Sequence, residues 1–121
     1  MDEQDRYRQG RYLRTHVLGQ AHVETAESGA TALNHALQDL TTRYGWGESW
    51  SRQDLDLRTR SLVTVAMLVA LGRPDELRVH LRGALRNGAS REEIGAVILH
   101  AAVYCAIWRS EERRVGKECR S

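Results

Sequence analysis

A short apolar segment in the middle of the chain constrains the fold more than any other feature. Every residue of Leu62–Leu71 except Thr64 is apolar. A helix of this composition is apolar around its whole circumference, which is typical of a helix buried in a core. The segment is much shorter than the roughly 18 residues that a membrane span needs. We therefore predict a central buried helix, capped by Asp54 or Asp56 and closed by Gly72.

The rest of the chain also has helical patterning. Before the apolar segment, apolar residues recur at steps of three and four, at Ala26, Ala30, Leu33, Leu37 and Leu40. Gly45 and Gly47 are expected to end that helix. Pro74 suits the first turn of another helix, and Ser90 with Glu93 forms a capping-box pattern. We predict helices over residues 6–18, 22 or 24 to 43, 54 or 56 to 71, 74–86 and 90–105. The predicted fold class is an all-α bundle in which short turns make consecutive helices neighbours.

The length and the charge balance narrow the possible functions. The chain has 121 residues and a formal net charge of +2, which indicates one domain without a strongly basic surface. Nucleic-acid binding is therefore not expected, and no segment predicts a signal peptide or a membrane span. Cys105 and Cys119 have neither a disulfide framework nor metal-ligand spacing. We expect a cytoplasmic protein.

The C-terminal segment differs in composition from the rest. Arg109–Ser121 is rich in charged residues, and its apolar residues are Val115 and Cys119. No apolar helical stripe can be drawn through it. We expect residues 1–108 to form the helical domain and residues 109–121 to be a charged tail, either disordered or not native to the domain.

His80 is the most informative of the histidines. Glu76 lies four residues before it on a predicted helix, so the two side chains share a face. A carboxylate beside an imidazole can orient the ring and raise its pKa. An ordinary surface pair at this spacing is the alternative, and spacing alone favours that alternative.

Aromatic residues gather around two glycines before the central helix. Tyr44, Trp46 and Trp50 flank or follow Gly45 and Gly47. A tryptophan in such a segment either anchors the chain on the core or forms the wall of a pocket. The anchoring role is somewhat favoured by the sequence.

A further pattern runs through six segments of the chain. They are Leu18–Val23, Trp46–Arg52, Thr59–Leu62, Ala66–Leu77, His80–Gly88 and His100–Cys105. In this order and spacing they resemble the carboxymuconolactone decarboxylase family, and in particular its 4-carboxymuconolactone decarboxylases of the protocatechuate branch of the β-ketoadipate pathway. The resemblance covers about residues 5–108.

The resemblance implies an all-α, AhpD-like fold assembled as a homo-oligomer, a trimer or a hexamer. It also implies loss of CO2 from 4-carboxymuconolactone, a small dicarboxylate lactone, to form 3-oxoadipate enol-lactone without cofactor or metal. The chemistry is consistent with this, because electrons left by CO2 can spread through the double bond into the lactone carbonyl. After Cys105 the chain departs from the family pattern, so we expect the family's last native helix to be missing.

The reaction suggests a role for each candidate residue. His80 is the candidate proton donor, with Glu76 orienting it. Arg60 and Arg82 are candidates for binding the substrate carboxylates, since a guanidinium matches a carboxylate in shape. The other candidates are Tyr104 as a catalytic hydrogen-bond donor, His22 as a donor that binds substrate, and Trp46 and Trp50 as walls that exclude water.

Three alternatives remain open. A thiol peroxidase of the wider AhpD-like group is disfavoured, because its Cys-x-x-Cys pair would fall on Arg73 and Glu76 and its relay glutamate on Ser61. A related decarboxylase of another lactone or β-keto acid would need a different substrate. A truncated, inactive helical oligomer would show no turnover with any substrate.

Overall fold

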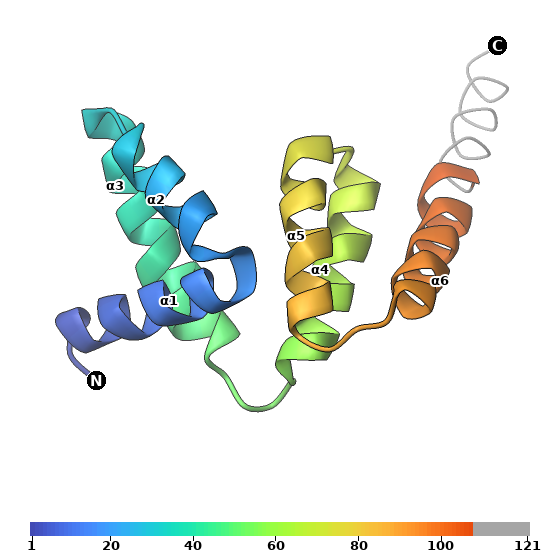
Figure 1. Cartoon of the computed structure of the whole chain (residues 1–121), viewed down its shortest axis with the longest axis horizontal. Helices are drawn as coiled ribbons and strands as arrows, with labels where there is room; N and C mark the ends of the chain where they lie inside the picture. The colour runs from blue at the N-terminus through green and yellow to red at the C-terminus, as the bar shows by residue number, and fades with distance from the viewer. Residues whose placement is uncertain (108–121) are drawn as a thin grey trace, which may run out of the picture. The chain divides into compact units, whose positions relative to one another are not determined.

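The computed structural model describes residues 1–107 and is all-α over that range, as the sequence predicts. Its elements, in chain order, are α1 (Glu3–Leu18), α2 (Gln20–Ser28), α3 (Ala32–Leu40), the π-helix η1 (Thr41–Trp50), α4 (Leu57–Leu71), α5 (Pro74–Arg86), α6 (Arg91–Ala101) and the π-helix η2 (Ala102–Ile107) (Figure 1). None of the helices in the described range is long and apolar enough to cross a membrane. The predicted charged tail, 109–121, lies outside the described residues.

The chain divides into two compact units, the first ending at Arg60 and the second beginning at Ser61. Each unit is described by itself below. The N-terminal unit contains α1, α2, α3 and η1, and the C-terminal unit contains nearly all of α4 followed by α5, α6 and η2.

The predicted helix from residue 22 or 24 to residue 43 is wrong in both its continuity and its end. The chain leaves the helix after Ser28, and Thr31 caps a new one by accepting a hydrogen bond of 3.2 Å from the backbone N–H of Asn34. Helical backbone then continues through Gly45 and Gly47 as η1. The apolar periodicity that suggested one helix runs through both α2 and α3, and it does not detect the break between them.

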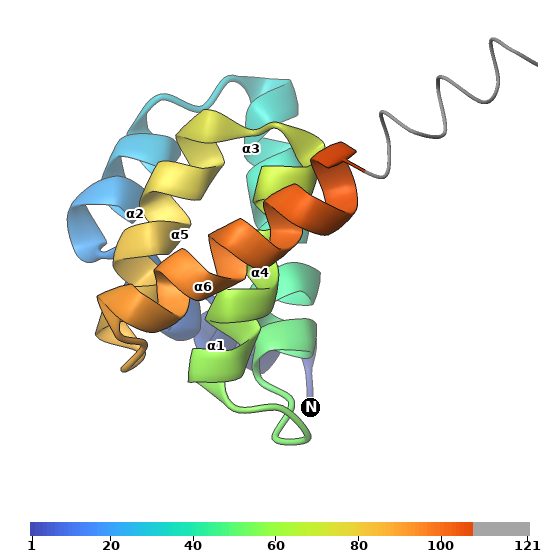
Figure 2. The same ribbon diagram turned by 90° about the vertical axis from the view of Figure 1, so that its right-hand side faces the viewer.

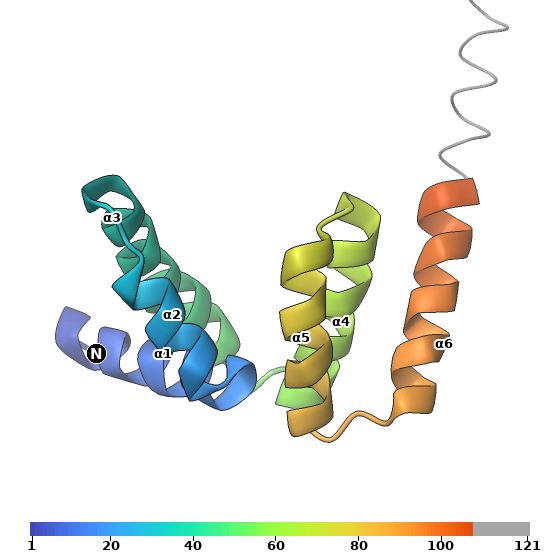
Figure 3. The same cartoon turned by 45° about the horizontal axis from the view of Figure 1, so that its top comes forward.

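Close packing between α1 and η1 requires a glycine at Gly10 and at Gly47. A Cβ atom on Gly10 of α1 would overlap the carbonyl oxygen of Thr42, and one on Gly47 would overlap that of Arg6. The backbones of α1 and η1 therefore cross in direct contact, which Figures 1 and 3 show at the base of the N-terminal unit. This crossing decides which side chains of η1 face α1.

The capping and terminating residues predicted for the helices of the C-terminal half are confirmed. Asp56 caps α4, since its Oδ1 accepts a hydrogen bond of 2.7 Å from the backbone N–H of Thr59. Gly72 takes a φ of 66° where α4 ends, and Pro74 occupies the first turn of α5. Ser90 and Glu93 make the reciprocal hydrogen bonds of a capping box at the start of α6, both of 3.0 Å.

The C-terminal unit is built on an antiparallel pair formed by α4 and α5 (Figures 1 and 3). Its core consists of Val65, Ala84, Ala89 and Ile94, with Leu62, Leu77, Leu81, Val97 and Ile98 packed against them. Figure 2 shows that α6 runs obliquely to that pair. The second turn of α4 is tied to the C-cap of α5, because Nδ2 of Asn87 donates a hydrogen bond of 2.9 Å to Oγ of Ser61.

The prediction that the apolar segment forms a fully buried helix is wrong for this chain. Only Ser61 and Val65 of α4 are buried, whereas Met67 is 58% exposed and Leu71 is 71% exposed. The segment does form the expected helix. A helix in a small unit with few neighbours cannot cover its whole circumference, however apolar it is.

Candidate functional site

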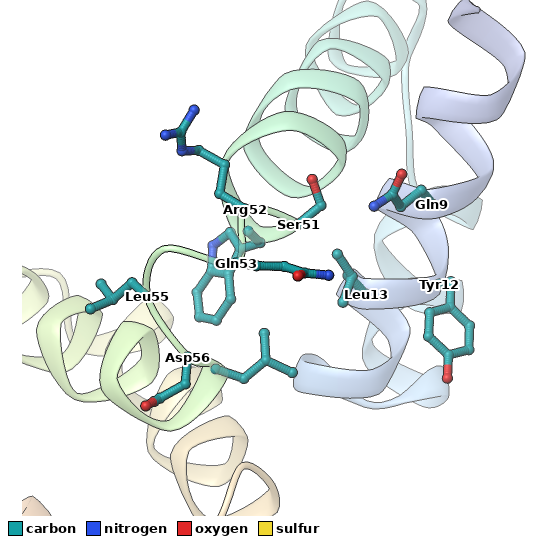
Figure 4. A pocket seen from close by; sticks show the side chains of 10 residues that line it. Gln9, Tyr12, Leu13, Ser51, Arg52, Gln53, Leu55 and Asp56 are labelled. Carbon is teal, nitrogen blue, oxygen red and sulfur yellow. The ribbon is translucent and has the colours of Figure 1, made fainter. Parts of the chain in front are cut away.

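The N-terminal unit contains a pocket between α1 and the segment that follows η1. Its volume is about 580 Å³, which falls in the range of about 300–1,000 Å³ typical of small-molecule sites. Figure 4 shows Leu13 and Gln53 pointing into this hollow, while Arg52 points away from it. The lining is mostly apolar and comes from Gln9, Tyr12, Leu13, Trp50, Ser51, Arg52, Gln53, Leu55, Asp56 and Leu57.

The two tryptophans of η1 have different roles, one as an anchor on the core and the other as a wall of the pocket. Their rings stack with centroids 4.6 Å apart and planes inclined by 24°. Trp46 is 5% exposed and belongs to the core of the N-terminal unit, so it is an anchor. Trp50 is half-buried and lines the pocket. Trp46 therefore supports the ring that forms the pocket wall.

Arg60 holds the loop that carries much of the pocket lining. Its Nε donates to the carbonyl oxygen of Leu55, and its Nη2 donates to the carbonyl oxygen of Arg52 and to Oδ1 of Asp54, each at 3.1 Å. The Arg60 side chain is 13% exposed. A guanidinium that bonds two backbone carbonyls fixes the course of residues 52–55.

Asp54 forms ion pairs with Arg52 of this loop and with Arg60 of α4. A hydrogen bond from Arg52 is the main cause that lowers the pKa of Asp54, and the charge of Arg60 acts in the same direction. Arg52 and Asp54 are both exposed at the surface. The charge of Asp54 is thus paired with the charges of Arg52 and Arg60. His22, the remaining candidate of this unit, is exposed on α2.

The C-terminal unit holds Glu76 and His80 one turn apart on α5. The main partner of Glu76 is Arg73, whose Nη2 donates a hydrogen bond of 3.0 Å to Oε1 of Glu76. This bond is the largest cause lowering the pKa of Glu76, and the charge of His80 adds a smaller contribution of the same sign. His80 is half-buried, whereas Glu76 is exposed.

The other two candidates of this unit are both exposed. Arg82 lies two residues after His80, so the two side chains project to opposite sides of α5. Tyr104 is 59% exposed in η2, and its ring lies 4.8 Å from that of His100 at an interplanar angle of 41°. His100 thus accompanies Tyr104 at the surface.

The sequence did not point to most of the pocket lining. Gln9, Tyr12 and Leu13 lie on one segment of α1, and Gln53 lies more than thirty residues later in a loop. None of these residue types forms a motif, and only the crossing of α1 with η1 brings them to one pocket. Within residues 1–107, no group of three or more His, Cys, Asp or Glu side chains could hold a metal ion.

Comparison with known proteins assigns the family. Residues 35–111, more than half of the chain, match the model of the carboxymuconolactone decarboxylase family. The chain belongs to this family. It is 45% identical over 107 residues to the 4-carboxymuconolactone decarboxylase of Acinetobacter baylyi, covering 88% of the chain and 80% of that protein. It is also 41% identical over 97 residues to the nitrosuccinic acid decarboxylase of Metarhizium robertsii, covering 80% and 68%.

The thiol-peroxidase positions have other uses in this carboxymuconolactone decarboxylase family member. Arg73 and Glu76, where the resemblance puts the two cysteines of peroxidase-type relatives, form an ion pair of 3.0 Å instead. Ser61, at the position of the relay glutamate, is fully buried and accepts the hydrogen bond from Asn87. A dithiol relay needs two thiols and a carboxylate at the relay position, whereas these positions hold Arg73, Glu76 and Ser61.

Proposed function

We propose that this protein decarboxylates 4-carboxymuconolactone to 3-oxoadipate enol-lactone, as one step of the protocatechuate branch of the β-ketoadipate pathway. The observation that carries this proposal is the 45% identity to the Acinetobacter enzyme, which extends over 88% of the chain. The second relative, also named a decarboxylase, supports the same class of reaction.

The two named substrates share a chemical feature. Each is a dicarboxylic acid in which the carbon that loses CO2 can pass its electron pair to an acceptor. In 4-carboxymuconolactone the acceptor is the lactone carbonyl, reached through the double bond, and in nitrosuccinic acid it is the nitro group. The C–C bond breaks, its electron pair becomes an enolate or nitronate, and a proton then forms a new C–H bond. Because the substrate is its own electron sink, the protein must only bind carboxylates, stabilise the developing oxyanion and deliver the proton.

His80 is the residue that we assign to proton delivery. It is half-buried on α5, and its charge is one of the smaller causes that lower the pKa of Glu76. Partial burial keeps an imidazole accessible to a ligand while holding its orientation. Glu76, which is itself held by Arg73, then acts as a positioning residue. Tyr104 and His22 are assigned as hydrogen-bond donors, Tyr104 to the developing oxyanion and His22 to the substrate.

The two arginine candidates receive different roles. We assign Arg82 to a substrate carboxylate, because its exposed guanidinium has no ion pair within residues 1–107. Arg60 is occupied by the loop carbonyls of Arg52 and Leu55, so we assign it to positioning the pocket loop. Trp50 forms the pocket wall and Trp46 supports it.

We also propose that the protein acts in the cytoplasm as a homo-oligomer, a trimer or a hexamer. Large apolar side chains at the surface of the described chain support association, among them Leu33, Leu37, Met67, Leu71 and Leu99. Burying such side chains is favourable by about 1.5–3 kcal/mol each. Light scattering coupled to size-exclusion chromatography distinguishes these oligomers from a monomer.

The test is CO2 release from 4-carboxymuconolactone, compared between the wild type and the variant His80→Gln. We expect turnover by the wild type and a loss of about 100-fold or more in the variant, the range of general acid–base catalysis. His16→Gln, an exposed histidine on α1, is the matched control and should keep wild-type turnover. Near-normal turnover of His80→Gln would remove His80 as the acid.

A substrate panel separates the alternatives. Nitrosuccinate and other lactone or β-keto acids are tested with the same preparation. Turnover of one of these but not of 4-carboxymuconolactone would replace the proposed substrate. No turnover from a folded oligomer with any of them would contradict the enzymatic proposal and favour the inactive oligomer.

A further inference from the structure

A buried arginine in the N-terminal unit has no carboxylate partner. Arg14 of α1 is 7% exposed, and its Nη1 donates a hydrogen bond of 3.3 Å to Oγ1 of Thr42. Its buried Nε has no hydrogen-bond acceptor among residues 1–107. No Asp or Glu of the described range lies within ion-pair distance of it. Burial lowers the pKa of Arg14, yet a guanidinium remains protonated in proteins, so its charge stays inside the unit.

Arg14 faces a small polar cavity of about 110 Å³. The lining comes from Tyr7, Arg14, Glu27, Ala30, His35, Gln38, Asp39 and Thr42. The cavity is far smaller than the pocket beside Trp50, and it is smaller than the sites of about 300 Å³ or more that hold drug-sized ligands. The side-chain oxygen of Gln38 is likewise buried without a partner in the described part of the chain.

The two carboxylates that line this cavity are already paired with other arginines. Both oxygens of Glu27 accept hydrogen bonds from Arg11, at 3.2 and 2.9 Å. Oδ2 of Asp39 accepts one of 3.0 Å from Arg43. Glu27 attracts Arg14 only from beyond ion-pair distance, as its contribution to the pKa of Arg14 indicates. With these two pairs neutral, the charge left at the cavity is positive.

We propose that this cavity is a binding site for a small planar oxoanion with a single negative charge, of the size of formate or nitrate. A guanidinium presents parallel N–H groups along the edge that includes Nε, and a planar oxoanion accepts both of them. Such an ion would satisfy Nε of Arg14 and compensate a charge that is costly to bury alone. The cavity size excludes a lactone dicarboxylate. The site is independent of the proposed decarboxylation.

The direct test follows the Nε–H resonance of Arg14 by 1H–15N NMR while sodium formate is added to the full chain. A sodium chloride titration at equal ionic strength is the reference. We expect a saturable shift with formate, and with nitrate, that chloride does not reproduce. A cavity filled only by water would give no shift or the same shift in both titrations, and that result would overturn the proposal.

Variants locate the site. The backbone amide of Thr42, which lines the same cavity, reports formate binding in every variant. Arg14→Lys keeps the charge but loses the planar guanidinium, and we expect formate affinity to fall about tenfold or more. Arg11→Lys, which changes the arginine already paired with Glu27, is the matched control and should retain affinity within about twofold. Equal losses in both variants would contradict a site at Arg14.

A third variant keeps the proposal testable if Arg14→Lys does not fold. Gln38→Glu places a carboxylate of nearly the same shape beside Arg14. If the cavity lacks an anion, this variant should raise the midpoint of thermal unfolding in formate-free buffer and abolish the formate-dependent shift. Retained formate binding in a folded Gln38→Glu variant would place the anion elsewhere and overturn the proposal.

Discussion

Ser61 and Asn87 meet in the C-terminal unit through a hydrogen bond of 2.9 Å from Nδ2 of Asn87 to Oγ of Ser61. Ser61 is fully buried in the second turn of α4, and Asn87 is the C-cap of α5. This bond therefore connects the N-terminal part of α4 with the C-terminal end of α5.

Removing that bond should destabilise the protein without affecting its surface. For Ser61→Ala we expect a loss of about 1–3 kcal/mol in the free energy of unfolding, because the amide of Asn87 loses its buried partner. Urea denaturation measures the difference. Ser49→Ala, at an exposed serine of η1, is the control and should change stability by less than about 0.5 kcal/mol. Equal effects in the two variants would show that the bond contributes little.

The crossing of α1 and η1 predicts a large effect at a glycine. In Gly10→Ala the new methyl group would overlap the carbonyl oxygen of Thr42, which is backbone and cannot rotate away. We expect a loss of about 1–3 kcal/mol or more, as for overpacked cores. Gly95→Ala in α6, where a Cβ meets nothing within 4 Å, should instead stabilise by about 0.5–1 kcal/mol. Thermal unfolding of both variants tests this contrast.

Asp56 should contribute a pH-dependent part of the stability. Hydrogen bonds from Thr59 lower the pKa of Asp56 in the folded state. A carboxyl whose folded pKa is depressed stabilises the fold above its unfolded pKa of about 3.9, and loses that contribution as the pH falls through the folded value. Asp56→Asn should flatten the dependence of stability on pH between about pH 5 and 2. An unchanged acid-unfolding profile in the variant would contradict this role.

Trp46 and Trp50 should differ in how they affect folding and binding. Trp46→Ala removes a buried anchor, and we expect a loss of about 3–5 kcal/mol in stability. Trp50→Ala should cost less, because that ring is half-buried, but it should enlarge the pocket beside α1. Comparing unfolding free energies with substrate KM for the two variants separates these effects. A Trp50→Ala variant with unaltered KM would indicate that the substrate does not use this pocket.

Several local features follow from residues that act on their own backbone. Asp56, Pro74 and the pair Ser90 and Glu93 begin helices where expected, and Gly72 ends one with a positive φ. Such signals depend on hydrogen bonds and dihedral preferences within one helical turn. They can therefore be read from the sequence without knowing which other helices pack nearby. The family resemblance is equally a property of residue order, and the comparisons confirm it.

Packing between distant segments could not be predicted in the same way. The sequence suggested that Gly45 and Gly47 end a helix, whereas both lie inside η1, where the approach of α1 requires a glycine at position 47. The sequence suggested that Arg60 binds a substrate carboxylate. The hydrogen bonds of its side chain instead hold the loop before α4. The roles proposed for Glu76, His80 and Arg82 in catalysis remain predictions.

The sequence by itself determined the all-α class, the bounds of α4 and α5, the start of α6 and the family. These depend on the spacing of apolar residues, on capping groups and on residue order, all of which are local. Only the tertiary structure decided that Trp46 is an anchor while Trp50 lines a pocket, and that Arg14 is buried against Thr42 without a carboxylate. Burial and partner choice depend on which backbones come close in space, and here a pair of glycines in segments far apart in the chain sets that approach.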